Sequence, residues 1–204
     1  MSYSIKYCGI LIIAAGQSKR MGTPKQLLTV GGDTLINRLI EIVKKAGTFP
    51  VTLVLGAAAE SIKAQLTRTD LLIVLNDAWE EGMAGSIRIG LTRMMHTCPT
   101  LDGVMILVCD QPFISEENIR SLLALQRETN LPIAACYYAN VLGTPALFHQ
   151  SIFPELLSLK GDTGAKKIIM NKASEVAKLH FDQGVIDIDT MDDYEQILKA
   201  GFIK

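Results

Sequence analysis

Short apolar runs rich in β-branched residues alternate along this chain with longer segments whose apolar residues recur at helical spacing. The short runs predict strands over residues 8–14, 51–55, 71–75, 104–109, 132–138, 144–148 and 185–188. The longer segments predict helices over residues 35–46, 58–66, 86–95, 116–128, 163–171 and 191–200. Strands that are apolar on both faces and alternate with helices predict an α/β fold, with a three-layer, mostly parallel, Rossmann-like sheet between helices. Two successive strand candidates between about residues 132 and 150 interrupt the alternation, so we expect a small antiparallel excursion there.

Composition narrows the class of protein further. The chain has 204 residues, of which 49% are hydrophobic and 20% charged, and it contains no repeat or Pro/Gly/Ser-rich linker. We therefore expect one domain over residues 1–204. The net charge of −1 argues against a nucleic-acid or membrane-surface binder, and the longest apolar stretch, residues 8–16, is shorter than a membrane span. Four widely spaced cysteines without a C-x-x-C pair indicate reduced thiols and a cytoplasmic location.

Positive charge is concentrated in the loop that follows the first predicted strand. No Asp or Glu precedes Asp33, whereas Lys19, Arg20 and Lys25 lie within one glycine-containing loop. In parallel sheets ligands bind beyond the carboxyl ends of the strands, so a basic loop at this point predicts an anion site. Gly16 and Gly22 are separated by five residues, which fits neither the dinucleotide-binding fingerprint nor the P-loop.

Six segments in register carry a resemblance to a known family. They read Ala14-Ala-Gly-x-Ser-x-Arg-Met-Gly-x-Pro-Lys25, Gly82-Met-x-x-Ser-x-x-x-Gly-Leu91, Asp110-Gln-Pro112, Gly143-Thr-Pro-Ala-Leu-Phe148, Gly161-Asp-Thr-Gly-Ala-Lys166 and Asp187-Ile-Asp-Thr-x-x-Asp193. Together they resemble the MobA-like nucleotidyltransferases and are most similar to the molybdenum cofactor cytidylyltransferases. Two departures from the family pattern are Lys166 in place of Arg and Met191 in place of Pro.

The resemblance implies a nucleotide site in the first loop. It assigns Lys25 to the transferred α-phosphate and Arg20 to the departing pyrophosphate, and both count with Asp110 as catalytic residues. The walls around the base and triphosphate are implied at Ala14, Ala15, Gly16, Gln17, Ser18, Gly82 and Ser86. Ser86 fits equally well as a residue at the start of a helix. The family pairs Ala-Ala-Gly with cytidine and Ala-Gly-Gly with guanosine, so this chain is expected to use CTP.

The resemblance also implies a magnesium site. Asp110 ends a buried strand at the ligand edge, where an unpaired carboxylate costs solvation free energy. The family uses this aspartate to bind Mg²⁺, and Asp189 is implied as a second ligand, with Asp187 a weaker choice. The alternatives are a turn Asp before Pro112 and a cap of the helix that begins after Thr190.

The resemblance also implies that Gly143, Pro145 and Asp162 bind the acceptor substrate. The alternatives are a β-turn at Gly143 and Pro145 and the start of a helix at Asp162. The implied reaction transfers CMP from CTP to the phosphate of molybdopterin and releases pyrophosphate, and a molybdenum hydroxylase that receives the product is a further implied partner. Another acceptor such as a sugar phosphate, guanylyl transfer, or a non-catalytic maturation factor for a xanthine-dehydrogenase-type hydroxylase remain alternatives.

Overall fold

A seven-stranded sheet forms the centre of the computed structural model, which describes residues 2–18 and 21–200. The strand order is β5-β4-β1-β6-β8-β7-β9. The strands are β1 (Cys8–Ala14), β4 (Val51–Leu55), β5 (Leu72–Leu75), β6 (Gly103–Val108), β7 (Ile133–Tyr138), β8 (Val141–His149) and β9 (Val176–His180). A separate two-stranded hairpin joins β2 (Thr29–Val30) to β3 (Asp33–Thr34).

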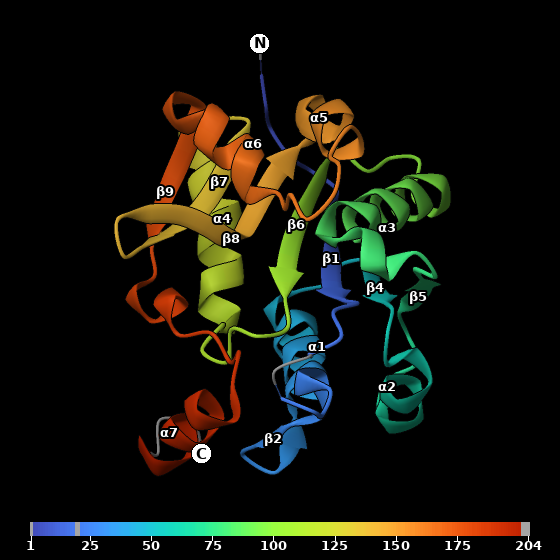
Figure 1. The fold of residues 1–204 in the computed structure, drawn as a ribbon. Coiled ribbons are helices and arrows are strands. Elements are labelled where there is room, and N and C mark those ends of the chain that lie inside the picture. The colour runs from blue at the N-terminus through green and yellow to red at the C-terminus, as the bar shows by residue number, and fades with distance from the viewer. Residues whose placement is uncertain (1, 19–20, 201–204) are drawn as a thin grey trace.

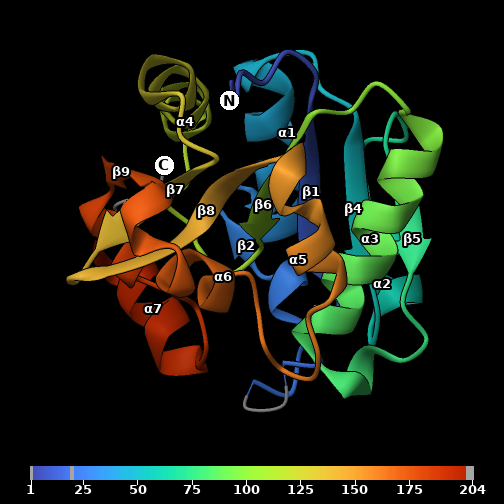
Figure 2. The ribbon, with the colours of Figure 1, turned by 90° about the horizontal axis from the view of Figure 1, so that it is seen from above.

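Helices cover both faces of the sheet (Figures 1 and 2). They are α1 (Leu35–Ala46), α2 (Ala59–Gln65), α3 (Met83–Thr97), α4 (Glu116–Thr129), α5 (Phe153–Leu157), α6 (Lys166–Asn171) and α7 (Met191–Ala200). Apolar residues of α1, α2, α4 and α7 pack into one buried cluster, and those of α3, α5 and α6 into another on the opposite face. Each central strand contributes alternate residues to both clusters, as Ile10 and Leu11 of β1 do. Burial on both faces therefore explains why these strands are almost continuously apolar.

Strand direction places the ends of the central strands at one edge of the sheet. β1 pairs in parallel with β4 and with β6, and β4 pairs in parallel with β5. β8 runs antiparallel to its neighbours β6 and β7, and β9 is parallel to β7. The carboxyl ends of β4, β1 and β6 thus meet at the edge where a ligand is expected in sheets of this kind.

The predicted fold class is confirmed, including the antiparallel excursion formed by β7 and β8. The predicted strand over residues 185–188 is wrong, because a 3₁₀ turn (Asp182–Val185) and backbone that belongs to no strand occupy this segment. Val185 is 55% exposed, so this apolar run does not form a strand that is buried on both faces. β9 forms this edge of the sheet. It was not predicted because Lys178 and His180 interrupt its apolar residues.

Helix bounds also differ in places. The helix predicted over residues 163–171 begins at Lys166, and the one predicted over 86–95 extends over Met83–Thr97. α5 was not predicted because five residues are too few to show helical periodicity. No helix among the residues that the structure describes is long and apolar enough to cross a membrane.

Candidate active site

Three segments that are distant in sequence converge at the carboxyl edge of the sheet. The Lys25 Nζ lies 2.7 Å from Oδ2 of Asp110 and 3.1 Å from Oδ1 of Asp189. Lys25 belongs to the loop after β1, and Asp110 follows β6. Asp189 is brought to them because the backbone N–H of Ile188 donates to the backbone carbonyl of Asp110 at 2.9 Å. The structure therefore brings three of the predicted site residues together at one point.

Local backbone geometry holds Lys25 in place. Its N–H donates to Oγ of Ser18 at 3.0 Å, and Ser18 adopts a left-handed backbone with φ of 54°. The next side chain, Gln26, is buried, and its Nε2 donates to the carbonyl of Ala14 at 3.1 Å and to that of Gly16 at 3.4 Å. The loop is thus tied back to the end of β1, which limits where the ammonium can lie.

The charges at this point shift the ionisation of two groups. Burial disfavours the charged form of Lys25, but the carboxylates of Asp110 and Asp189 outweigh this effect and raise the Lys25 pKa. The pKa of Asp187 is raised to about 6, first by burial and then by repulsion from Asp110 and Asp189. One ammonium therefore does not neutralise the carboxylates gathered here.

This excess of negative charge fits a divalent cation. Within residues 2–18 and 21–200 no group of three or more His, Cys, Asp or Glu side chains forms a ready-made metal cage. Mg²⁺ does not require one, because it commonly binds through one or two carboxylates together with substrate phosphates and water. Asp110 and Asp189 supply two such carboxylates, and both already face a single cationic group in Lys25.

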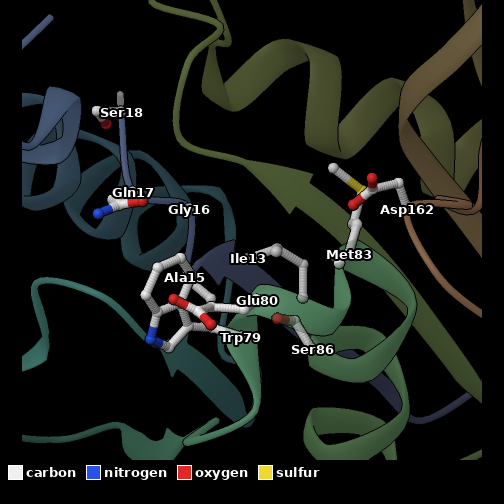
Figure 3. A pocket seen from close by; sticks show the side chains of 11 residues that line it. Ile13, Ala15, Gly16, Gln17, Ser18, Trp79, Glu80, Met83, Ser86 and Asp162 are labelled. Carbon is white, nitrogen blue, oxygen red and sulfur yellow. The ribbon is translucent and has the colours of Figure 1, made fainter. Parts of the chain in front are cut away.

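A pocket of about 560 Å³ opens at this edge of the sheet (Figure 3), and one of its lining residues, Ser18, accepts the hydrogen bond from the N–H of Lys25. Residues from the loop after β1 line one wall, and the start of α3 lines another. The lining residues are Ile13, Ala15, Gly16, Gln17, Ser18, Trp79, Glu80, Gly82, Met83, Ser86 and Asp162. Six of the residues predicted to bind nucleotide lie among them. Ala14 lies behind this wall, where its carbonyl accepts the hydrogen bond from Gln26.

Gly82 allows the α3 wall to approach a neighbouring loop. Its φ of 101° favours glycine, and a Cβ at this position would lie 2.4 Å from Oδ1 of Asp162. The neighbouring Ser86 is buried, and its Oγ accepts a hydrogen bond from Nδ2 of Asn76 at 3.0 Å. Asp162, predicted on the acceptor side, thus lies on the wall of the same pocket as the predicted nucleotide residues.

The other two residues predicted on the acceptor side lie on β8. A cis peptide bond joins Thr144 to Pro145, and a Cβ on Gly143 would lie 2.3 Å from the Tyr138 hydroxyl. That hydroxyl donates to the carbonyl of Thr144 at 3.2 Å and accepts from Nε2 of Gln111 at 3.3 Å. Gly143 therefore has a packing role that its sequence motif did not indicate. Neither Gly143 nor Pro145 lines the pocket beside Lys25.

Arg20 lies outside the described residues, so its predicted contact with pyrophosphate stays a prediction. Sequence reasoning missed Gln26, Gln111 and Trp79. Gln26 directly follows Lys25, and Gln111 directly follows Asp110. Both side chains are buried, which nothing in the sequence indicates for a glutamine. Trp79 is an aromatic residue in the polar segment before the Gly82-Met motif, and this contrast is the signal that could have drawn attention to it.

Comparison with known proteins identifies the family. Residues 10–176 match the MobA-like NTP transferase domain. The chain belongs to this family. It is accordingly a nucleotidyltransferase.

The names of two similar proteins refer to different processes, an oxidation–reduction reaction and purine catabolism. The transferase is 30% identical over 171 residues to nicotine blue oxidoreductase of Paenarthrobacter nicotinovorans, covering 79% of this chain and 81% of the relative. It is 28% identical over 203 residues to purine catabolism protein PucB of Bacillus subtilis, covering 93% and 95% of the two chains.

Solved structures with the same fold include Rv0371c of Mycobacterium tuberculosis. This crystal structure superposes with a TM-score of 0.84 at 31% identity and covers 96% of this chain and 98% of that chain. A manganese complex of Rv0371c superposes with a TM-score of 0.79 at 28% identity, covering 96% of this chain and all (100%) of that chain.

Proposed function

We propose that this transferase moves CMP from CTP to the terminal phosphate of molybdopterin, with Mg²⁺ as the metal and pyrophosphate as the second product. The observation that carries the proposal is the contact of Lys25 with both Asp110 and Asp189 beside a pocket large enough for a nucleotide. The six family motifs and the Ala14-Ala15-Gly16 sequence support the choice of cytidine and of a pterin phosphate.

The reaction is an in-line displacement at phosphorus. An oxygen of the acceptor phosphate forms a bond to the α-phosphorus of CTP, and the bond from that phosphorus to the bridging oxygen breaks. Pyrophosphate leaves with the electron pair. Because the acceptor phosphate is already ionised, no side chain has to remove a proton. The obstacle is repulsion between two anions, which positioned cationic groups reduce.

Lys25 supplies the cationic group nearest to the reaction in this proposal. Its raised pKa keeps the ammonium charged at neutral pH, so it can bind an α-phosphate oxygen as charge develops there. Asp110 and Asp189 would hold Mg²⁺, which supplies further neutralisation of the phosphates when bound. Gln26 holds the loop that carries Lys25 against β1, so the ammonium is positioned before substrate arrives.

Release of pyrophosphate tests the proposal directly. The protein is incubated with Mg²⁺, purified molybdopterin and each of the four NTPs, and pyrophosphate is measured with a coupled assay. We expect turnover with CTP, and a loss of about 100-fold or more in Asp110→Ala. Glu128→Gln, an exposed change on α4, serves as the matched control and should leave the rate unchanged.

Each alternative outcome has a defined meaning. Turnover with GTP in preference to CTP would show guanylyl transfer. Turnover of CTP with a sugar phosphate but not with molybdopterin would replace the acceptor. A normal rate in Asp110→Ala would contradict the proposed role of that carboxylate, and binding of molybdopterin without turnover of any NTP would favour a non-catalytic maturation factor.

A further inference from the structure

Trp79 is the one tryptophan of the sequence, and it lies on the wall of the nucleotide pocket. It begins a 3₁₀ turn (Trp79–Glu81) between β5 and α3. Figure 3 shows its indole beside Ala15 and Gly16, on the side of the pocket opposite Asp162. The side chain is half-buried, so part of this large aromatic surface is open to a ligand.

A glycine at the end of β4 creates the space in which Trp79 is seated. A Cβ on Gly56 would lie 2.5 Å from the carbonyl oxygen of Ala15 and 2.7 Å from Cβ of Trp79. The backbone is also fixed on both sides of this contact. The N–H of Ala57 donates to the carbonyl of Ala15 at 3.3 Å, and the N–H of Gly82 donates to the carbonyl of Trp79 at 3.1 Å. The stem of Trp79 is therefore held against the end of β1.

The pocket wall around Trp79 differs chemically from the part nearest Lys25. Trp79 and Ile13 supply aromatic and aliphatic surface, with the Glu80 carboxylate beside the indole, whereas Met83 lies across the pocket next to Asp162 (Figure 3). Ser18 lies on the same lining, and its Oγ accepts a hydrogen bond from the N–H of Lys25 at 3.0 Å. An elongated ligand with a flat apolar group at one end and phosphates at the other matches this polarity. In a nucleoside triphosphate, the base would meet the wall around Trp79 and the triphosphate would extend toward Lys25.

We propose that the Trp79 indole is the surface on which the nucleobase stacks, and that it sets the affinity for the nucleotide without taking part in the chemical step. Every base has an aromatic face, and stacking on tryptophan or tyrosine is a common source of nucleotide affinity. The inference rests on the proposed function because it requires a nucleotide in this pocket. It does not depend on which acceptor the enzyme uses.

The single tryptophan makes nucleotide binding visible by fluorescence. The protein is titrated with CTP, UTP, GTP and ATP in the presence of Mg²⁺ while Trp79 emission is recorded. We expect the bound substrate nucleotide to change the emission saturably. Inorganic tripolyphosphate is the matched probe, since it carries the phosphates without a base. It should compete with the nucleotide while producing a much smaller change in emission.

Substitution at Trp79 separates binding from chemistry. In Trp79→Leu we expect the KM for CTP to rise about tenfold to hundredfold with kcat within about threefold of the unchanged protein, because uniform binding is lost. Trp79→Phe keeps an aromatic face and should raise KM by less than Trp79→Leu. Gly56→Ala keeps the indole but adds a Cβ that would displace the Trp79 side chain. It should therefore raise the KM for CTP while Trp79 emission is retained.

The outcomes distinguish this inference from the proposed function. An unchanged KM in Trp79→Leu, or saturable binding of the substrate nucleotide with no change in Trp79 emission, would overturn the stacking role. If Trp79→Leu does not fold, as judged by circular dichroism, Trp79→Phe and Gly56→Ala decide the matter, and a wild-type KM in both overturns it. Binding of CTP that changes the emission, without pyrophosphate release on any pterin phosphate, would contradict the acceptor and leave the stacking role standing.

Discussion

Lys25 and Asp110 are 85 residues apart in sequence, and their side chains meet at 2.7 Å. The same ammonium contacts Asp189, so it reduces the repulsion between two carboxylates. A lysine in this position does two things. It lowers the repulsion between the acidic groups, and it contacts the same oxygens that the proposed function assigns to a divalent cation.

Replacing Lys25 should therefore separate catalysis from metal binding. In Lys25→Met we expect pyrophosphate release to fall by about 100-fold, because a charge-assisted contact to the reacting phosphate is lost. We expect affinity for free Mn²⁺ without nucleotide to increase, because the ammonium no longer competes for Asp110 and Asp189. Electron paramagnetic resonance of unbound Mn²⁺ measures this affinity. Lys44→Met, which breaks the 2.7 Å pair with Asp70, is the control. Equal Mn²⁺ affinity in the Lys25 variant and the unchanged protein would rule out the competition.

Gly143 is expected to be a packing position governed by Tyr138. A Cβ at Gly143 would lie 2.3 Å from the Tyr138 hydroxyl, so Gly143→Ala should lower the free energy of unfolding by about 1–3 kcal/mol. Tyr138→Phe removes the hydroxyl and much of this clash. The double variant should therefore be more stable than the sum of the two single effects predicts, which urea denaturation measures. Strict additivity would show that the hydroxyl is not the obstacle.

His149 should make stability depend on pH. Burial lowers its pKa, although Asp102 partly opposes the shift. The imidazole Nδ1 accepts a hydrogen bond from the N–H of Ser151 at 3.1 Å, which requires a neutral acceptor. The unfolded chain therefore takes up the proton at a higher pH than the folded protein. The stability contribution is present above the ordinary histidine pKa of about 6.5 and is lost as pH falls below it.

His149→Asn keeps an acceptor at this cap but does not titrate. We expect its free energy of unfolding to fall less between pH 7 and pH 5.5 than that of the unchanged protein, as measured by urea denaturation at each pH. His96→Asn, an exposed change near the end of α3, should retain the original pH dependence. Identical slopes for all three proteins would contradict the role of His149.

The cysteines should differ sharply in reactivity. Burial raises the pKa of Cys8 and of Cys136 to about 12, and it also raises that of Cys109. Since the thiolate is the reactive form, Cys98, which is partly exposed, should be the one thiol that reacts rapidly with a disulfide reagent at pH 8. Cys98→Ser should abolish the fast phase. Rapid reaction of more than one thiol in the folded protein would contradict this expectation.

The amino-acid sequence alone determined the elements that bury a continuous face. The bounds of β1, β4 and α1 follow from apolar runs or helical periodicity, because each of them buries such a face against the core. The start of α7 follows instead from Thr190 and the acidic residues after it, since Ile197 is the one residue of this helix that is buried. β9 could not be predicted, because the exposed Lys178 and His180 interrupt its apolar residues. The adjacent apolar run from Val185 was interpreted as a strand, yet its backbone turns away to meet Asp110.

Motif order in the sequence also indicated which residues belong to the site, but their contacts were decided by the tertiary structure. Lys25 and Asp189 are 164 residues apart, and no local pattern specifies that they meet. They do so because parallel pairing of β1 with β6 aligns the carboxyl ends of these strands, and because one backbone hydrogen bond ties Ile188 to Asp110. The position of Trp79 is decided in the same way, since only folding brings Gly56, which has no side chain, against Ala15 and Cβ of Trp79. The periodicity of apolar residues in a segment indicates which of its faces packs against the core. The distances between side chains of different segments depend instead on the order and direction of the strands in the whole sheet.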